Sequence, residues 1–162
     1  MAFQPKEGYV MCEYCGCRQV EPIAQLMDEH LALLELGGEV SRALHGQGGR
    51  AASELLQELR DLLDRHVRLE ERGVFAAMKA ESEFVDQVLE LEQEHDDLDR
   101  ALAELNLADD DVASVVDRLL AELSDHIDRE NLGIFPVAVV SLGATGWEIV
   151  TRAHEEQKAA AS

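Results

Sequence analysis

The sequence is poor in aromatic residues, which make up 4% of the chain, and it contains only three prolines. Positive charge is also scarce, because 14 lysines and arginines stand against 34 aspartates and glutamates, giving a formal net charge of -20. This balance argues against nucleic acid or an anionic membrane surface as a partner. Leucine, alanine and glutamate dominate instead, and 46% of the residues are apolar. The composition therefore favours one helical domain over a sheet or a disordered chain.

Long hydrophobic runs are missing as well. The longest one, residues 132–142, is interrupted by glycine, proline and serine and is too short to span a bilayer. The first ten residues lack the basic and apolar regions of a secretory signal. Three cysteines, Cys12, Cys15 and Cys17, lie within six residues, and this odd, clustered count is not a disulfide framework. We therefore expect a location in the reducing cytoplasm.

Apolar residues recur at three- and four-residue steps in four long segments, which predicts four helices. The first three cover about 22–44, 51–80 and 82–105, with Ser82 as an N-cap; the fourth follows Asp109–Asp111 and is kinked or ended by Pro136. Short connections make neighbouring helices antiparallel. The predicted fold class is therefore all-α, an up-down-up-down four-helix bundle.

The bundle is expected to occupy residues 21–142. A Cys-rich extension, 1–20, precedes it. Residues 143–162 are expected to form a short C-terminal helix and a tail, with Trp147 packed against the bundle.

Each predicted helix carries one histidine in the stripe that should be apolar. These histidines are His30, His66, His95 and His126. Two of them are followed one turn later by a carboxylate, Glu70 after His66 and Glu130 after His126. The i,i+4 spacing places each pair on one helix face.

The motif around these pairs is repeated. Residues 66–75 align without a gap with residues 126–135, and both stretches share His, Glu, Gly, a β-branched residue and Phe. Residues 26–30 likewise match 91–95. The chain thus reads as two copies of a helical hairpin that would build a pseudo-symmetric site. Gly73 and Gly133 are expected to let a neighbouring helix approach closely.

A lone histidine on an apolar face is ordinarily a satisfied core residue. Four imidazoles and two carboxylates that converge in a core need compensating positive charge, which bound metal ions supply. Imidazole and carboxylate without thiolate suit iron or manganese, with zinc a further candidate. Six protein ligands are natural for two bridged metals.

The order His30, His66-x-x-x-Glu70, His95, His126-x-x-x-Glu130, closed by Phe135-Pro136, resembles the hemerythrin-like (HHE cation-binding) family. The resemblance extends over about residues 22–140. It implies a non-haem di-iron centre, two iron ions rather than manganese or zinc, with all six residues as ligands and Glu70 and Glu130 as bridges. It also implies oxygen binding, oxygen or iron sensing, iron handling, or reaction with peroxide or nitric oxide.

The sequence departs from the oxygen-carrying branch of that family. That branch has a second histidine four residues from the one on the third helix, whereas Leu91 and Asp99 stand here. It also has an aspartate where this chain has Asn131. The departure favours a reactive or sensing centre over a simple oxygen carrier, with Asp99 as a further candidate ligand. The reactive centre would turn over oxygen, peroxide or nitric oxide with an unidentified electron donor. The alternatives are an oxygen or iron sensor or store without turnover, and a structural zinc protein.

The cysteine cluster has more than one interpretation. Cys12, Cys15 and Cys17 could hold a metal whose fourth ligand comes from His45, His154 or a second subunit. They could also cycle between dithiol and disulfide, or could be incidental. His45 and His154 are themselves expected to face solvent. Beside the proposed ligands, three glutamates lie about a quarter-turn away, where they would support the ligands or lie on the surface. They are Glu29, Glu71 and Glu94.

Overall fold

The computed structural model describes residues 2–3 and 16–162, and this part of the chain contains helices and no strand. The predicted all-helical class is confirmed. The helices are α1 (Glu21–Leu44), α2 (Ala52–Arg72), α3 (Val74–Ala80), α4 (Val85–Ala103), α5 (Val112–Arg129), α6 (Phe135–Ser141) and α7 (Ala144–Ala160), with a 3-10 turn, η1 (Cys17–Gln19), and a π-helical turn, η2 (Glu130–Ile134). Among the described residues, no helix is long and apolar enough to cross a bilayer.

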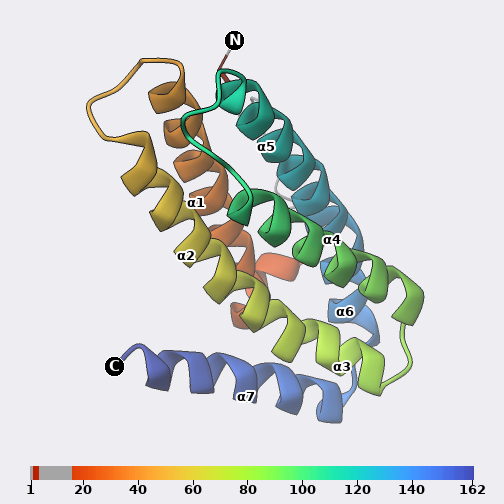
Figure 1. Ribbon diagram of the computed structural model, residues 1–162. Helices are drawn as coiled ribbons and strands as arrows, with labels where there is room; N and C mark the ends of the chain where they lie inside the picture. The colour runs from red at the N-terminus through yellow and green to blue at the C-terminus, as the bar shows by residue number, and fades with distance from the viewer. Residues whose placement is uncertain (1, 4–15) are drawn as a thin grey trace.

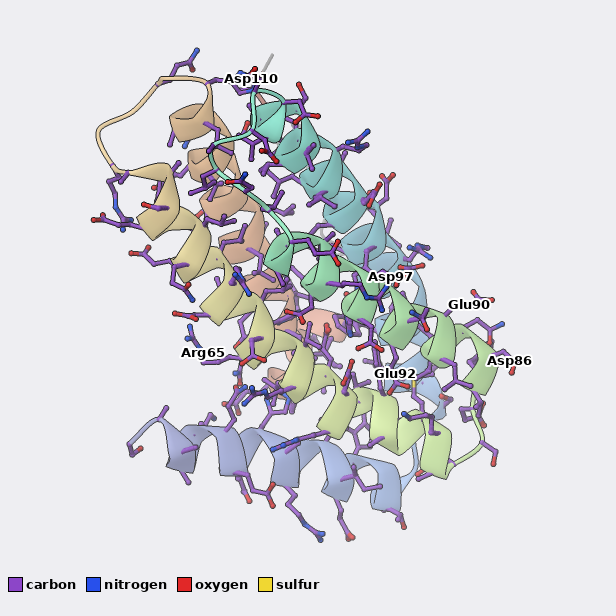
Figure 2. The ribbon with its side chains drawn as sticks, in the orientation of Figure 1. Arg65, Asp86, Glu90, Glu92, Asp97 and Asp110 are labelled. Atoms are coloured by element: carbon purple, nitrogen blue, oxygen red, sulfur yellow. The ribbon has the colours of Figure 1, made fainter. Side chains whose placement is uncertain are left out.

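The four longest central helices pack side by side as a helical bundle (Figure 1). α1 packs against α2 and α5, and α4 packs against α2 and α5. α7 lies across one end of the bundle beside α3, and it also contacts α1 and α2. Acidic side chains such as Asp86, Glu90 and Asp97 lie on the exposed side of α4 (Figure 2). The net negative charge is thus carried in part by the outer faces of the helices.

The apolar core is divided into two clusters along the bundle. The end nearer α7 has a first apolar cluster that includes Leu26, Phe75, Phe135 and Val150. The other end has a second apolar cluster that includes Leu33, Leu59, Leu120 and Leu123. Each of the four long helices places its histidine between these two clusters. A polar layer therefore separates the two apolar clusters. Such a layer is tolerated only where its charges are compensated.

The second predicted helix is interrupted, which corrects the continuous helix expected over 51–80. α2 ends at Arg72, and α3 begins at Val74 after Gly73. A Cβ atom at Gly73 would lie 2.7 Å from the Leu69 carbonyl oxygen and 3.5 Å from the Cβ of Ala153 in α7. Glycine therefore avoids a clash with the last turn of α2, while Ala153 of α7 lies at ordinary van der Waals distance. At Gly133 an added Cβ would meet no atom within 4 Å, so the expected close packing there is wrong.

Two predicted helix boundaries also differ from the structure. Ser82 is not an N-cap: it has φ 58° in a turn, and Phe84 stands at the N-cap of α4 without a side-chain capping bond. The fourth predicted helix widens into η2 directly at Glu130 and resumes as α6. Pro136 lies in the first turn of α6, where its missing N–H leaves no hydrogen bond unmade. Trp147 packs against the first apolar cluster as expected.

Candidate metal centre

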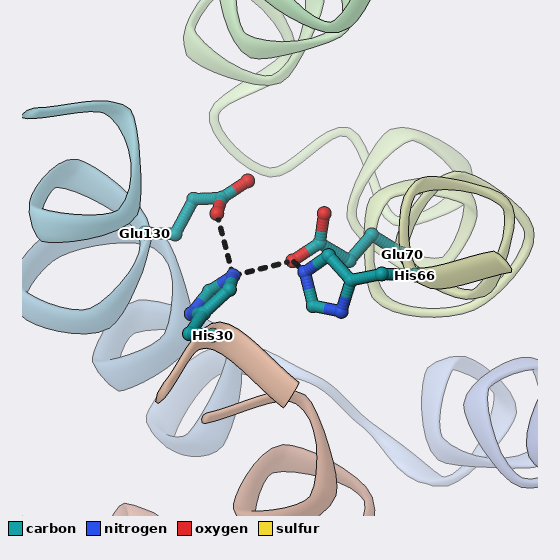
Figure 3. A group of neighbouring side chains, drawn as sticks. All are labelled: His30, His66, Glu70 and Glu130. Atoms are coloured by element: carbon teal, nitrogen blue, oxygen red, sulfur yellow. Dashed lines mark ion pairs between the residues drawn. The ribbon is translucent and has the colours of Figure 1, made fainter. Parts of the chain in front are cut away.

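The six residues that the sequence predicts as ligands meet in the polar layer between the two apolar clusters. They form two groups that share one carboxylate: His30, His66, Glu70 and Glu130, and His95, His126 and Glu130. Within each group the candidate ligand atoms lie within 4.8 Å of one another, and all six side chains are buried. Figure 3 shows the first group, with the imidazoles and carboxylates directed toward a common centre.

Both carboxylates reach histidines of both halves of the chain. The Oε1 atom of Glu70 lies 3.0 Å from His66 Nε2 and 3.3 Å from His30 Nε2. Its Oε2 atom lies 3.3 Å from His95 Nε2. Glu130 places Oε1 3.0 Å from His126 Nε2 and Oε2 3.0 Å from His30 Nε2. Each glutamate thus lies where it could bridge two ions.

The polar atoms of this cluster fit a bound cation better than they fit one another. The Nε2 atoms of His30 and His66 and both oxygens of Glu70 and Glu130 are buried without a hydrogen-bond partner, although they lie close together. The Nε2 atoms of His95 and His126 face each other at 3.0 Å. Two imidazole lone pairs repel at this distance unless a proton or a cation lies between them. Donor atoms about 3 Å apart are also what two ligands bound at about 2.1 Å to one ion would show.

Every histidine uses its other ring nitrogen in a hydrogen bond outside the cluster. Nδ1 pairs with a glutamate oxygen in three cases: His66 with Glu29 (2.8 Å), His95 with Glu71 (3.0 Å) and His126 with Glu94 (2.7 Å). These bonds keep the ring proton on Nδ1 and direct the Nε2 lone pair into the cluster, as in metal-binding histidines. The three glutamates therefore support the ligands, one of the two roles expected for them.

The fourth histidine has a partner that sequence reasoning missed. His30 Nδ1 lies 2.9 Å from Oδ1 of Asn131, which is buried. The available signal was positional, since Asn131 follows Glu130 as Glu71 follows Glu70. In both repeats the residue after the carboxylate ligand bonds the single histidine of the other half.

Two phenylalanines extend the same pseudo-symmetry. Phe135 stacks on His30 with ring centroids 5.6 Å apart, and Phe75 stacks on His95 at 5.8 Å. Both phenylalanine side chains are fully buried. Each ring comes from one hairpin and lies on the single histidine of the other, so the repeated motif also locks the two hairpins together.

Without metal, the electrostatics of the cluster keep both signs of charge inside the core. Burial lowers the pKa of His30, but the negative charges of Glu130 and Glu70, at 3.0 and 3.3 Å, outweigh burial and raise the pKa to about 10. Burial also lowers the pKa of His95, but the same two carboxylates, together with Glu71, outweigh burial and raise the pKa to about 12. Burial would raise the pKa of Glu70, yet the histidines hold it well below the usual range. Protons therefore take the place of metal ions, and metal binding must displace them.

The second group borders an open cleft. A cavity of about 370 Å³ between α4 and α5 is lined by His95 and His126 and by an apolar wall. The wall consists of Leu98, Ala101, Leu119 and Leu123. Glu94, Asp97, Glu122, Asp125 and Arg129 complete the lining, so the cleft has an acidic rim. Neither His30 nor His66 lines this cavity.

Several other candidates lie outside the cluster. Asp99 is exposed and belongs to neither group. Cys12 and Cys15 lie outside the described residues, whereas Cys17 is buried and disulfide-bonded, which disfavours a thiolate metal site at that residue. The expectation that His154 faces solvent is wrong, because this residue of α7 is buried. His45 is partly exposed, and its Nε2 atom lies 2.8 Å from Oδ2 of Asp117.

The geometry agrees with the comparisons to known proteins. Searches of curated proteins and of solved structures gave no match. The model of the hemerythrin HHE cation-binding domain matches residues 21–138, which include all six clustered residues and exclude α7. With most of the chain matched and a buried His/Glu cluster able to bind metal where the motif predicts it, the protein belongs to the hemerythrin HHE cation-binding family.

Proposed function

We propose that this protein is a non-haem di-iron protein that binds oxygen, peroxide or nitric oxide and reacts with them. The observation that supports it is the pair of buried ligand groups joined by Glu130, with orphaned atoms directed at their centres. Imidazole and carboxylate donors suit iron, and they suit manganese or zinc less specifically. Bound iron would supply the electron-transfer chemistry that these side chains lack. We retain an up-down-up-down helix order, a cytoplasmic location and an unidentified electron donor as parts of the proposal.

The chain's own residues prepare this site in advance. Glu70 and Glu130 reach both halves, so they hold the two metal positions at a set separation. The Nδ1 bonds fix each imidazole before metal arrives, which reduces the reorganisation needed for binding. Two histidines and shared carboxylates in each group leave room for an external ligand beside the protein donors.

The lining of the cleft between α4 and α5 favours the access of small, uncharged ligands. Its apolar wall lies beside His95 and His126. Its acidic rim disfavours anions by charge repulsion, whereas oxygen, hydrogen peroxide and nitric oxide carry no charge. We therefore propose that ligands reach the second group first.

A sensor or store without turnover is the second candidate. The polar layer separates two apolar clusters, so metal loading bears directly on the stability of the whole bundle. A partner could read that change. Turnover of the ligand separates this candidate from the first.

The test begins with anaerobic loading with Fe²⁺ and elemental analysis, for which we expect about two metals per chain, as a bridged pair requires. The loaded protein should then consume hydrogen peroxide or nitric oxide, and His66→Ala and His126→Ala should abolish consumption. One zinc per chain would contradict the di-iron proposal. Reversible oxygen binding without consumption of either compound would move the protein to the sensor or store class.

A further inference from the structure

Helix α7 lies beyond the residues matched by the family model, yet it is connected to the metal centre. Its His154 is buried, and Nδ1 lies 3.0 Å from Oε1 of Gln25 in α1. Gln25 donates from Nε2 to Oε1 of Glu29 at 2.9 Å. The other oxygen of Glu29 accepts from Nδ1 of His66 at 2.8 Å. Four side chains thus form one hydrogen-bonded chain from α7 to a ligand of the first group.

The direction of every bond in this chain follows from the amide of Gln25. Because Gln25 donates from Nε2 to Glu29, its Oε1 atom faces His154 and can only accept. His154 must then carry a proton on Nδ1. Burial lowers the pKa of His154, and its Nε2 is buried without a partner, which agrees with a neutral ring protonated on Nδ1 alone.

The second half of the chain lacks this connection. Glu94, the counterpart of Glu29, bonds His126 in the same way, but both of its oxygens are bound by Arg129 at the cleft. The Glu94 side chain is 34% exposed, against 24% for Glu29. α7 therefore breaks the pseudo-symmetry of the repeat. One group is supported from α7, and the other from a surface arginine.

We propose that α7 is part of the metal centre, with His154 as a positioning residue that orients His66 through Gln25 and Glu29. Its loss should weaken metal binding by the group of His30 and His66 and leave the group of His95 and His126 unchanged. This inference rests on the proposed function in one respect, namely that His66 is a ligand.

Three variants of the full-length protein test it. His154→Leu removes the donor to Gln25. His154→Asn keeps an N–H group near the place of Nδ1 and should rescue. Val150→Ala is the matched control, because Val150 is buried one turn earlier in α7 and its truncation loosens packing without touching the chain. Each variant is titrated anaerobically with Fe²⁺ against a competing chelator, and its melting temperature is measured without metal.

We expect His154→Leu to lower the affinity for one of the two Fe²⁺ ions by about tenfold. This is the low end of the loss of metal affinity seen when a group that orients a metal-bound histidine is removed. His154→Asn should restore most of that affinity. Val150→Ala should lower the melting temperature and leave both equivalents unchanged. Equal weakening by His154→Leu and Val150→Ala, or equal weakening of both equivalents, would overturn the proposal.

A second readout needs no metal. Imidazole nitrogen NMR of the metal-free protein should show the His66 Nδ1–H signal shifted in His154→Leu and the His126 signal unchanged. If the wild-type protein binds no Fe²⁺, the proposed function fails, while this spectrum still decides whether His154 orients His66. An unchanged His66 signal would reject the positioning role even in a protein that binds two irons.

Discussion

Asn131 stands where the first half of the chain has Glu71, and each accepts a hydrogen bond from the single histidine of the opposite half. The distances are nearly the same, 2.9 Å from His30 Nδ1 to Asn131 and 3.0 Å from His95 Nδ1 to Glu71. Only the charge differs, because one acceptor is an amide and the other a carboxylate. A carboxylate partner makes an imidazole more basic. The two ligand groups therefore differ in the charge beside their histidines as well as in their carboxylates, because Glu70 belongs to the first group alone.

Exchanging the charge at these positions should shift metal affinity from one group to the other. Glu71→Gln keeps an acceptor and removes the charge, so the group of His95 and His126 should bind its metal about tenfold more weakly. Asn131→Asp should strengthen the group of His30 and His66. Chelator competition on each variant measures both effects. The double variant is the control, since it should again bind one metal ion strongly and one weakly. Unchanged affinities in both single variants would contradict the proposed difference between the two groups.

The stability of the metal-free protein should depend on pH in a defined direction. The pKa values of His30 and His95 are raised from 6.5 to about 10 and about 12, so their stabilising effect is present below 6.5 and is lost as pH rises through the raised values. The pKa of Glu70 is lowered from 4.5, so its effect is present above 4.5 and is lost as pH falls through the lowered value. The metal-free protein should therefore be most stable between about 4.5 and 6.5.

Bound metal should remove the loss of stability at alkaline pH. The cation compensates the negative charges of Glu70 and Glu130, which protonated histidines compensate in the metal-free protein. The gap in melting temperature between metal-loaded and metal-free protein should widen from pH 6.5 to pH 10. Outward partners Glu29, Glu71 and Glu94 face the histidines in both states and do not change this sign. A metal-free melting temperature that rises over the same range would be inconsistent with protonated histidines in the cluster.

Equivalent glycines should respond differently to alanine. Gly73→Ala puts a Cβ 2.7 Å from the Leu69 carbonyl oxygen and against Ala153, so we expect a loss of roughly 1–3 kcal/mol in the free energy of unfolding. Gly133→Ala meets open space and should stay within about 0.5 kcal/mol or gain stability through a less flexible unfolded chain. Urea unfolding measures both, and equal losses would show that α7 does not depend on Gly73.

Filling the cleft between α4 and α5 should slow the reaction without removing the metals. Ala101→Phe places a large ring in the apolar wall and replaces none of the six clustered residues. We expect slower consumption of peroxide or nitric oxide with unchanged iron content. The control is Ala160→Phe, in a separate groove between α2 and α7. Equal rates in both variants would place the entry route elsewhere.

The local pattern of the sequence was sufficient to predict the helical class, the family and the set of residues that converge. Helical periodicity places His66 with Glu70 and His126 with Glu130 on one face each, because residues four apart stack on an α-helix. The repeat predicted a pseudo-symmetric site for the same reason, since equal spacing gives equal local geometry. Membership in the hemerythrin HHE family is confirmed by the match over residues 21–138.

Contacts between distant segments were decided only by the tertiary structure. The role of Asn131 depends on a histidine 101 residues away, and the burial of His154 depends on α7 docking beside Gln25, 129 residues away. Periodicity shows which face of a helix is apolar but not which helix will cover it, because that choice is made by packing and hydrogen bonding across the whole chain. For that reason the sequence determined which side chains converge, and the fold determined what holds each of them in place.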